Sequence, residues 1–251
     1  MEPLKVVIWG AGAMGLGVAR MISRKQGIEV AGAVDLSPEK IGRTLDTLTG
    51  CPQQRAITVV STLEEAMKAD PDIVLIATAS MTRDVFPRVM EVLKYGKPVI
   101  TTAEEMAYPR PTEPELCRKM DDLACEKGVA VLGTGINPGF VMDLLVVALS
   151  GACMDVRKVK VTRVNDLSPF GPTVLHEQGV GMTEEAFREG IRAGTVEGHV
   201  GFVQSIHMIS DALGLGVDRI DQGREPIVSK VRREEKGIVV EPGMVAGCRQ
   251  T

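Results

Sequence analysis

The sequence predicts an α/β protein, in which a doubly wound parallel sheet is followed by a second α+β domain with an open mixed sheet. Three observations support this fold class. A short apolar run, Lys5–Trp9, leads directly into the glycine-rich turn Gly10–Gly15. Strand-like and helix-like stretches then alternate as far as about residue 135. Beyond that point, helical stretches are mixed with segments in which apolar and polar residues alternate.

The glycine turn has the spacing of a dinucleotide-binding loop. Gly10 permits a tight turn, Gly12 lets the backbone approach a pyrophosphate, and Gly15 lets the next helix pack on the strand. The helix expected from Met14 to Lys25 would present its N-terminal amides to the anion. Glycines at this spacing also occur in purely structural turns, so the motif alone is weak. The residues predicted to bind the cofactor here are Gly10, Ala11, Gly12, Ala13, Met14 and Gly15.

A carboxylate at the end of the second strand indicates the type of dinucleotide. The apolar stretch Glu29–Val34 ends in Asp35, twenty positions after Gly15. A carboxylate there accepts hydrogen bonds from ribose hydroxyls and repels a 2′-phosphate, which favours NAD over NADP. Ser37 and Lys40 lie just beyond it and leave NADP possible, because they would hold a phosphate if the loop turned inward. Together the turn and Asp35 predict a Rossmann domain that binds NAD.

The rest of the first half completes the predicted parallel sheet. Strands are expected at Val59–Val60, Asp72–Thr78, Pro98–Thr102 and Val129–Leu132, and helices from Thr62, through Val85–Leu93 and from Thr112. The continuous apolar run in the second of these strands is typical of a central strand that is buried on both faces. Because the carboxyl ends of parallel strands face the ligand, Thr78, Ala79 and Thr102 are predicted to contact the cofactor. The predicted nucleotide-binding domain covers residues 1–135.

The second predicted domain covers residues 136–251 and is expected to bind substrate and to dimerise. Helices are expected after Asn137-Pro138-Gly139, from Thr183 and over Gly201–Leu213, and strands at Val159–Asp166, Ile227–Arg232 and Gly237–Val240. The final stretch, Pro242–Thr251, resembles an interior segment, so we expect this domain to be incomplete at its C-terminus.

The composition narrows the class of partner. The 251 residues carry a net charge of −4 with a pI near 5.6, so a basic surface for nucleic acid or anionic lipid is not expected. No apolar stretch approaches the ~20 residues that span a bilayer, and the N-terminus does not resemble a signal peptide, so we expect a cytoplasmic protein without membrane contact. The five cysteines form no C-x-x-C pair and have no nearby histidine at ligand spacing, which predicts free thiols and no metal.

Loops at the predicted strand ends hold the candidate catalytic residues. Glu104 and Glu105 follow the strand that is expected to end beside the nicotinamide, and one of them is predicted to reach the reacting carbon. The alternatives are a solvated loop or a helix cap. His199 lies between Gly198 and Val200-Gly201, where an imidazole can exchange protons near neutral pH, although a simple loop histidine fits equally well.

The candidate substrate-binding residues come from the second half of the chain. Asn137 and Pro138 belong to a glycine-rich turn that either contacts the ligand or forms a domain hinge. Arg163 is suited to hold a substrate carboxylate in a two-pronged ion pair, with Asn165 beside it, unless the strand is simply a charged sheet edge. His199 is a further candidate for substrate contact.

The motifs together resemble the 2,4-diaminopentanoate dehydrogenase family, which includes native amine dehydrogenases and is related to dihydrodipicolinate reductases in the nucleotide domain. The resemblance lies in Gly10–Gly15, Thr101–Glu105, Gly135–Asp143 and Gly198–Gly201. It implies NAD(P)-dependent oxidative deamination of 2,4-diaminopentanoate or a related amine, or the reverse reductive amination. It also implies that a glutamate of the second segment is catalytic, and Glu104 is favoured over Glu105 because it lies closer to the strand end.

Other functions fit the residues less well. A dihydrodipicolinate reductase is expected to carry paired histidines, which are absent here, and a homoserine dehydrogenase is expected to carry a lysine about where Glu104 stands. A dinucleotide-binding sensor without turnover is the alternative from another class, and the retained Glu104, Glu105 and His199 argue against it. The resemblance therefore implies an amine dehydrogenase that acts on a small-molecule amine or amino acid, and we expect it to be a homodimer because an open sheet in a second domain commonly pairs with its twin.

Overall fold

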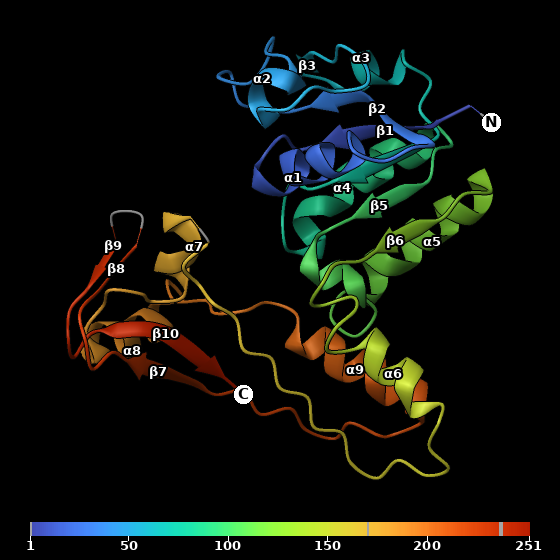
Figure 1. Ribbon diagram of the computed structural model, residues 1–251. Coiled ribbons are helices and arrows are strands. Elements are labelled where there is room, and N and C mark those ends of the chain that lie inside the picture. Colours follow the sequence, from blue (N-terminus) through green and yellow to red (C-terminus); the bar gives the residue numbers. More distant parts are fainter. Residues whose placement is uncertain (1, 170, 236–237) are drawn as a thin grey trace.

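The computed structural model describes residues 2–169, 171–235 and 238–251 (Figure 1). Its first half is a six-stranded sheet with the order β3-β2-β1-β4-β5-β6, and all neighbouring strands are parallel. The strands are β1 (Leu4–Trp9), β2 (Ile28–Val34), β3 (Val59–Val60), β4 (Ile73–Ile76), β5 (Val99–Thr101) and β6 (Val131–Gly133). This is the order of a doubly wound Rossmann sheet, which confirms the predicted fold class.

Helices cover both faces of the sheet. They are α1 (Ala13–Ile22), α2 (Leu45–Thr49), α3 (Leu63–Met67), α4 (Thr82–Lys94) and α5 (Pro114–Lys127). Successive residues of a strand point to opposite faces. In β1, Val6 and Ile8 accordingly pack in one apolar cluster with residues of α1 and α2, whereas Val7 and Trp9 pack in a second cluster with residues of α3, α4 and α5. Each face of the sheet therefore has its own core.

The backbone pairing continues one residue past the carboxyl ends of the central strands. The amide of Ala77 donates to Trp9 O at 2.8 Å, the amide of Thr102 donates to Ile76 O at 3.1 Å, and the amide of Thr134 donates to Thr101 O at 3.0 Å. These hydrogen bonds align the residues that follow β4, β5 and β6 along a single edge of the sheet. That edge is where ligands bind in open α/β folds.

Two helices of the second half pack beside this edge. They are α6 (Leu144–Ser150) and α9 (Phe202–Leu213), which contact each other, and α9 also contacts the short 3-10 turn η1 (Glu104–Ala107) that follows β5 (Figure 1). The buried Asp143 caps α6 and accepts a hydrogen bond from Ser205 of α9 at 2.7 Å. The hydroxyl of Tyr108 donates to Asp211 of α9 at 2.6 Å. Helix α9 is thus fixed against the loops of the nucleotide-binding half.

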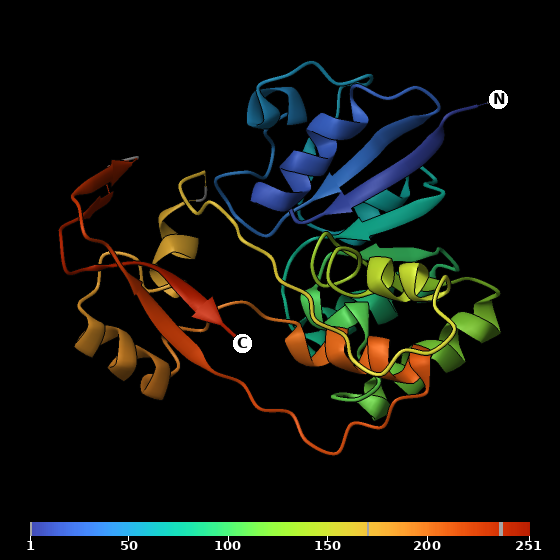
Figure 2. The ribbon, with the colours of Figure 1, turned by 60° about the horizontal axis from the view of Figure 1, so that its bottom comes forward.

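The remaining elements form a small lobe to one side of the sheet (Figure 2). They are α7 (Pro172–Glu177), α8 (Glu184–Ala193), β7 (Arg224–Val228), β8 (Arg233–Glu235), β9 (Ile238–Val240) and β10 (Val245–Gln250). β7 pairs with β10, and β8 pairs with β9, both antiparallel. Phe187 of α8, Val196 and Val245 form its buried cluster. The extended segment 155–166 leads from α6 toward this lobe, and the segment 214–223 connects α9 to β7 (Figure 1).

The structure corrects the prediction of an open mixed sheet. The second half has two two-stranded antiparallel sheets instead. Residues Val159–Asp166 form no strand in the part of the chain that the structure describes, and a strand requires a ladder of backbone hydrogen bonds to a neighbour. The strand predicted at Ile227–Arg232 begins three residues earlier, at Arg224. Of the stretch predicted at Gly237–Val240, Gly237 lies outside the described residues and the rest is β9.

Candidate active site

The glycine turn after β1 is fixed by packing at two of its glycines and open at the third. Gly10 has φ +107°, and a Cβ atom there would lie 2.5 Å from the carbonyl oxygen of Ala77. A Cβ atom on Gly15 would lie 1.8 Å from the carbonyl oxygen of Gly10. A Cβ atom on Gly12 would meet no atom within 4 Å, so the backbone at the start of α1 faces open space. Helix α1 directs its free amides toward that space, which suits a phosphate group.

Asp35 closes the same turn from the end of β2. One of its carboxylate oxygens, Oδ2, accepts a hydrogen bond from the amide of Ala11 at 2.7 Å and lies 3.2 Å from Nζ of Lys40. The other, Oδ1, accepts from the amide of Ser37 at 2.8 Å. Burial opposes ionisation of this carboxyl, but the contacts from Ser37, Lys40 and Ala11 outweigh it and hold its pKa below the ordinary value of 3.8. Asp35 is therefore an anion beside the glycine turn at neutral pH.

The other predicted cofactor residues lie at the same edge. Ala13 and Met14 form the first turn of α1, where Met14 is 63% exposed. Thr78 and Ala79 follow β4, and Thr102 follows β5. The hydroxyl of Thr78 is buried and has no hydrogen-bond partner in the part of the chain that the structure describes. A buried unpaired hydroxyl and an open amide-lined turn on one edge both fit a bound dinucleotide.

Glu104 and Glu105 begin η1, and their carboxylates differ in their surroundings. Oε2 of Glu105 accepts a hydrogen bond from the amide of Thr82 at 2.8 Å and so caps α4, whose N-cap residue, Met81, offers no side-chain hydrogen bond. Glu104 is half-buried and makes no hydrogen bond or ion pair to any described residue. The helix cap expected as an alternative for one of the two glutamates is thus Glu105, and Glu104 has a free carboxylate.

His199 lies opposite these loops and contacts Asn137. The side-chain amide Nδ2 of Asn137 lies 2.9 Å from Nε2 of His199, and Asn137 itself is buried with its Oδ1 unpaired among the described residues. Burial and the positive charge of Arg163 lower the pKa of His199 below 6.5, and a hydrogen bond to Asn137 opposes the shift. A neutral imidazole whose Nε2 accepts the Asn137 amide proton follows from this arrangement.

An open cleft of about 430 Å³ lies between the two halves of the chain. The wall of the cleft on the side of the nucleotide-binding half includes Glu105 and Met81. The opposite wall includes His199, the first turn of α9 and Arg224. Its volume is in the range of small-molecule sites. The structure thus brings Glu105 and His199 to one cleft, whereas Glu104 lies at the start of the same 3-10 turn but outside the cleft lining.

The remaining residues that were predicted to bind substrate differ in how close they lie to the cleft. Pro138 is buried next to Gly201, and a Cβ atom on Gly201 would lie 2.4 Å from the proline ring. The Asn137-Pro138 turn and the start of α9 therefore fit closely. Arg163 is half-buried and close enough to influence the charge of His199. Asn165 is exposed in the extended segment and does not line the cleft.

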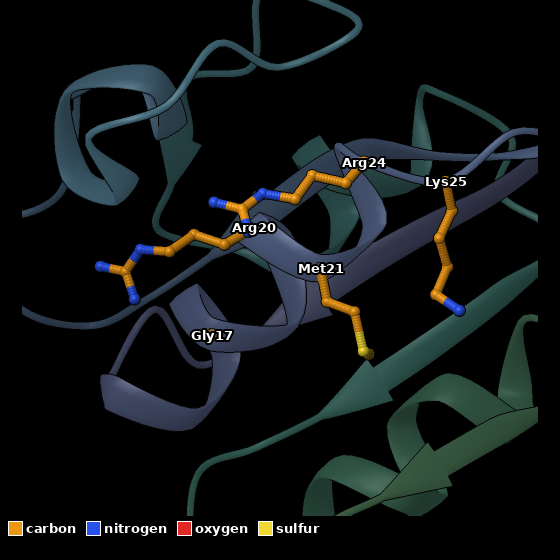
Figure 3. Close-up of a pocket in the computed structure, with 5 residues that line it drawn as sticks. All are labelled: Gly17, Arg20, Met21, Arg24 and Lys25. Atoms are coloured by element: carbon orange, nitrogen blue, oxygen red, sulfur yellow. The ribbon is translucent and has the colours of Figure 1, made fainter. Parts of the chain in front are cut away.

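The described residues form no metal centre, and a second depression lies apart from the cleft. They contain no group of three or more histidine, cysteine or acidic side chains placed to hold a metal, and no helix long and apolar enough to cross a membrane. A second depression of about 460 Å³ runs along α1 and is lined by Gly17, Arg20, Met21, Arg24 and Lys25 (Figure 3). Its side chains point apart over the outer face of the helix, and it shares no lining residue with the cleft.

Three residues with clear roles at the site were missing from the sequence-based prediction. The amide of Gln250 in β10 bonds both the backbone N–H of His199, at 2.7 Å, and its carbonyl oxygen, at 3.0 Å. Arg224 lines the cleft, and Asp143 joins the Asn137-Pro138-Gly139 turn to α6 and α9. Gln250 is 51 positions from His199, so no local pattern would have revealed the contact. Asp143 had a signal, since an aspartate before an apolar run is typical of an N-cap.

Comparisons with known proteins agree with this arrangement. Residues 140–251 match the family model described as the 2,4-diaminopentanoate dehydrogenase C-terminal domain, and residues 4–105 match the model described as the N-terminus of dihydrodipicolinate reductase. The 2,4-diaminopentanoate dehydrogenase of Acetoanaerobium sticklandii is 45% identical over 251 residues, covering 99% of this chain and 71% of the relative. An amine dehydrogenase of Streptomyces virginiae is 21% identical over 220 residues, covering 86% of this chain and 61% of the relative.

The solved structures give the same picture. The amine dehydrogenase from Mycobacterium smegmatis matches with a TM-score of 0.79 at 28% identity, over 98% of this chain and 73% of that one. GenD2 from gentamicin A biosynthesis, solved in complex with NAD, shares the fold with a TM-score of 0.50 at 16% identity. From the match of both halves and the high identity over nearly all its length, the chain belongs to the 2,4-diaminopentanoate dehydrogenase family.

Proposed function

We propose that this dehydrogenase binds NAD and oxidatively deaminates 2,4-diaminopentanoate or a closely related amine, and that it can run the reverse reductive amination. The observation that carries the proposal is the free, half-buried carboxylate of Glu104 at the end of β5, on the edge of the sheet that bears the glycine turn. Family membership supports the reaction class.

Glu104 fits the role of proton acceptor. An amine carbon can release a hydride only when its nitrogen is neutral, so the ammonium group of the substrate must first give up a proton. A bound dinucleotide supplies the hydride acceptor for this step. The Glu104 carboxylate takes the proton and then lies beside the positive charge that develops on the iminium nitrogen, for which an anion is the natural counterpart. Glu105 is less suited because one of its oxygens already accepts the Thr82 amide.

Water completes the reaction. It adds to the iminium carbon, and loss of ammonium leaves the ketone. The balance is protonated amine, oxidised dinucleotide and water to ketone, ammonium, reduced dinucleotide and one proton. We propose that His199 assists the proton transfers of the water, since its pKa is below the ordinary value and its imidazole is neutral near pH 7. Asn137 would orient that imidazole, and Arg163 would contribute positive charge beside it.

We propose NAD as the preferred dinucleotide because Asp35 is held as an anion beside the glycine turn. Lys40 is paired with Asp35 and is therefore engaged rather than free for a phosphate. The change Asp35→Asn keeps a hydrogen-bond acceptor for Ala11 but removes the charge. We expect it to shift the ratio of NAD to NADP affinity toward NADP by roughly 10-fold or more, as one charged hydrogen bond and one repulsion are lost. Equal ratios for wild type and variant, measured by calorimetry, contradict the NAD assignment.

The activity is tested by incubating the protein with NAD or NADP and following the absorbance of the reduced dinucleotide after adding amines. We expect 2,4-diaminopentanoate to give reduction with NAD, and the ketone with ammonium to reverse it. Binding of NAD without reduction across a panel of amines would instead support a dinucleotide-binding sensor and contradict the proposal. The expected product ratio is one ketone and one ammonium for each reduced dinucleotide.

We propose further that the chain works as a homodimer in the cytoplasm, with residues 1–135 as its nucleotide-binding domain and residues 136–251 as its substrate and dimerisation domain. Large apolar side chains of the second part are exposed, with Leu149 at 65%, Met154 at 106% and Val164 at 91%. Exposed apolar surface is common at subunit contacts. Sedimentation that yields one chain per particle contradicts the dimer.

A further inference from the structure

Glu197 is a free carboxylate on the wall of the cleft. It lies in the segment between α8 and α9, two residues before His199, and it is one of the residues that line the cleft. Its side chain is exposed and makes no hydrogen bond or ion pair to any described residue. Water solvates such a carboxylate while the cleft is open. A bound substrate displaces part of that water, so the charge of Glu197 then has to be balanced by the ligand.

The backbone on both sides of Glu197 is held in place by the lobe. The amide of Val196 donates to the carbonyl oxygen of Gly190 at 3.1 Å, and the amide of Gly198 donates to that of Glu177 at 3.3 Å. Val196 is 0% exposed and belongs to the buried cluster of the lobe. The lobe therefore presents the Glu197 carboxylate from a fixed backbone position, as a residue that selects a ligand requires.

The lining of the cleft carries more negative than positive charge. Its charged side chains are two glutamates, Glu105 and Glu197, and one arginine, Arg224. His199 adds no positive charge, because burial lowers its pKa and the imidazole is neutral near pH 7. The free carboxylate of Glu104 at the start of η1 adds to the excess of negative charge. This balance favours a ligand that carries more than one ammonium group.

The two glutamates of η1 leave a second ammonium group without an anion of its own. In the proposed function, the Glu104 carboxylate is engaged with the nitrogen that is oxidised. Oε2 of Glu105 accepts the hydrogen bond from the Thr82 amide. Glu197 is on the opposite wall, and both of its carboxylate oxygens are free within the part of the chain that the structure describes. A carboxylate and an ammonium group form a charge-assisted hydrogen bond, which is stronger than a neutral one.

We propose that Glu197 binds the ammonium group that is not oxidised and makes the enzyme selective for diamines over monoamines. In 2,4-diaminopentanoate, with carbon 4 as the oxidised position, this is the ammonium group on carbon 2. The inference rests on the proposed function and deepens it, because it names the residue that distinguishes the class of substrate. Glu197 takes no part in the proton transfers.

The first test compares two amines that differ only in the second ammonium group. They are 2,4-diaminopentanoate and 4-aminopentanoate, each measured with NAD, and the readout is the ratio of their kcat/KM values. Glu197→Gln keeps the size of the side chain and removes its charge. We expect it to lower this ratio by about 5- to 30-fold, mainly through a higher KM for the diamine, which is the range for one ion pair in a partly shielded cleft. Glu197→Asp keeps the charge on a shorter stem and is expected to fall between wild type and Glu197→Gln.

The matched control is Glu185→Gln. Glu185 is exposed in the first turn of α8 and does not line the cleft. The variant removes the same charge from the same lobe, so we expect the ratio of the two kcat/KM values to equal that of wild type. The role of Glu197 is overturned if Glu197→Gln leaves the ratio unchanged, if it lowers kcat/KM equally for both amines, or if Glu185→Gln lowers the ratio as much.

A second measurement separates this inference from the proposed activity. Calorimetry with the reduced dinucleotide bound requires no turnover, because no hydride acceptor is present. We expect wild type to bind 2,4-diaminopentanoate more tightly than 4-aminopentanoate, and Glu197→Gln to lose at least about 5-fold of that preference. If this result is obtained but no amine reduces NAD, the deamination is contradicted and the Glu197 site stands. Equal binding of the two ligands by wild type overturns the Glu197 site itself.

Discussion

The buried carboxylate of Asp143 is predicted to hold the site together, and Asp143→Asn tests it. Oδ2 accepts hydrogen bonds from the Gly139 amide at 2.8 Å and from the Ser205 hydroxyl at 2.7 Å, and Oδ1 accepts from the Leu144 amide at 2.6 Å. The side chain is 0% exposed. It therefore joins the Asn137-Pro138-Gly139 turn, the start of α6 and the first half of α9.

The magnitude follows from these contacts. An asparagine keeps one oxygen, so at least one of the two backbone N–H groups then faces an NH₂ group instead of an acceptor. Loss of one charged hydrogen bond, together with that donor–donor contact, costs about 2–4 kcal/mol. For a chain of this length that corresponds to a decrease of about 5–15 °C in the thermal midpoint. Because Gly139 is two residues from Asn137, we also expect kcat/KM to fall.

The assay is thermal unfolding followed by circular dichroism, with steady-state kinetics on the same preparation. Asp155→Asn is the matched control, since Asp155 is 61% exposed and pairs only with the nearby Arg157 at 2.6 Å. Surface changes of this kind stay within about 0.5 kcal/mol. A midpoint for Asp143→Asn within about 2 °C of that control refutes the reasoning that this carboxylate organises the turn and the two helices.

Two further predictions concern the glycine turn and pH. Gly15→Ala places a Cβ atom where the Gly10 carbonyl oxygen lies, so we expect it to abolish the NAD binding that calorimetry measures. The Cβ atom of Gly12→Ala meets no protein atom, so this variant is expected to weaken NAD binding only by taking space from the phosphate. Equal NAD affinities of the two variants contradict the packing argument. The pKa of His199 is below 6.5 in the folded chain because of burial and Arg163, so the unfolded chain takes up the proton first as pH falls. The stability from the neutral imidazole is therefore complete above pH 6.5 and lost as pH falls through the folded pKa. Between pH 7.5 and 5.5, the thermal midpoint of His199→Gln is expected to depend less on pH than that of the wild type. Parallel curves for the two proteins contradict this prediction.

The first half of the fold was predictable because its signals are local. The glycine turn, the strand before it and Asp35 all lie within one continuous stretch, and the alternation of strands and helices indicates a doubly wound parallel sheet. Thr62 and Thr183 also cap α3 and α8 as expected from N-cap preferences. Helix α2, with five residues, and α7, with six, were missed, although α3 is equally short and was recognised from its cap at Thr62.

The second half depends on contacts that the sequence does not display. The Val159–Asp166 stretch does show alternation, since Val159, Val161 and Arg163 are half-buried while the residues between them are exposed. It is nevertheless no strand, because the alternation of a sequence does not supply a neighbour to pair with. β10 was missed for the opposite reason, as its glycine and polar residues carry no strand pattern, and its pairing with β7 alone makes it a strand.

The candidate site shows the same division. Sequence reasoning placed Glu104 and Glu105 at a strand end and His199 in a glycine-bearing loop of the second half. The structure separates the roles of the two glutamates only through the Thr82 contact. The contact of Asn137 with His199 spans 62 positions, so it follows from the fold and not from spacing. The same holds for Arg224, whose place in the cleft lining is visible only in three dimensions.

The measurement that tests the central claim most directly is the kinetic comparison of Glu104→Gln with Glu105→Gln. In Glu104→Gln we expect kcat for amine oxidation to fall by about 10²- to 10⁴-fold, the usual range for a lost proton acceptor, while the Kd for NAD stays within about twofold. Glu105→Gln keeps an oxygen for the Thr82 amide and is expected to retain most of the activity. If Glu104→Gln turns over at the wild-type rate, or if Glu105→Gln alone is inactive, the free carboxylate at the end of β5 is not the proton acceptor.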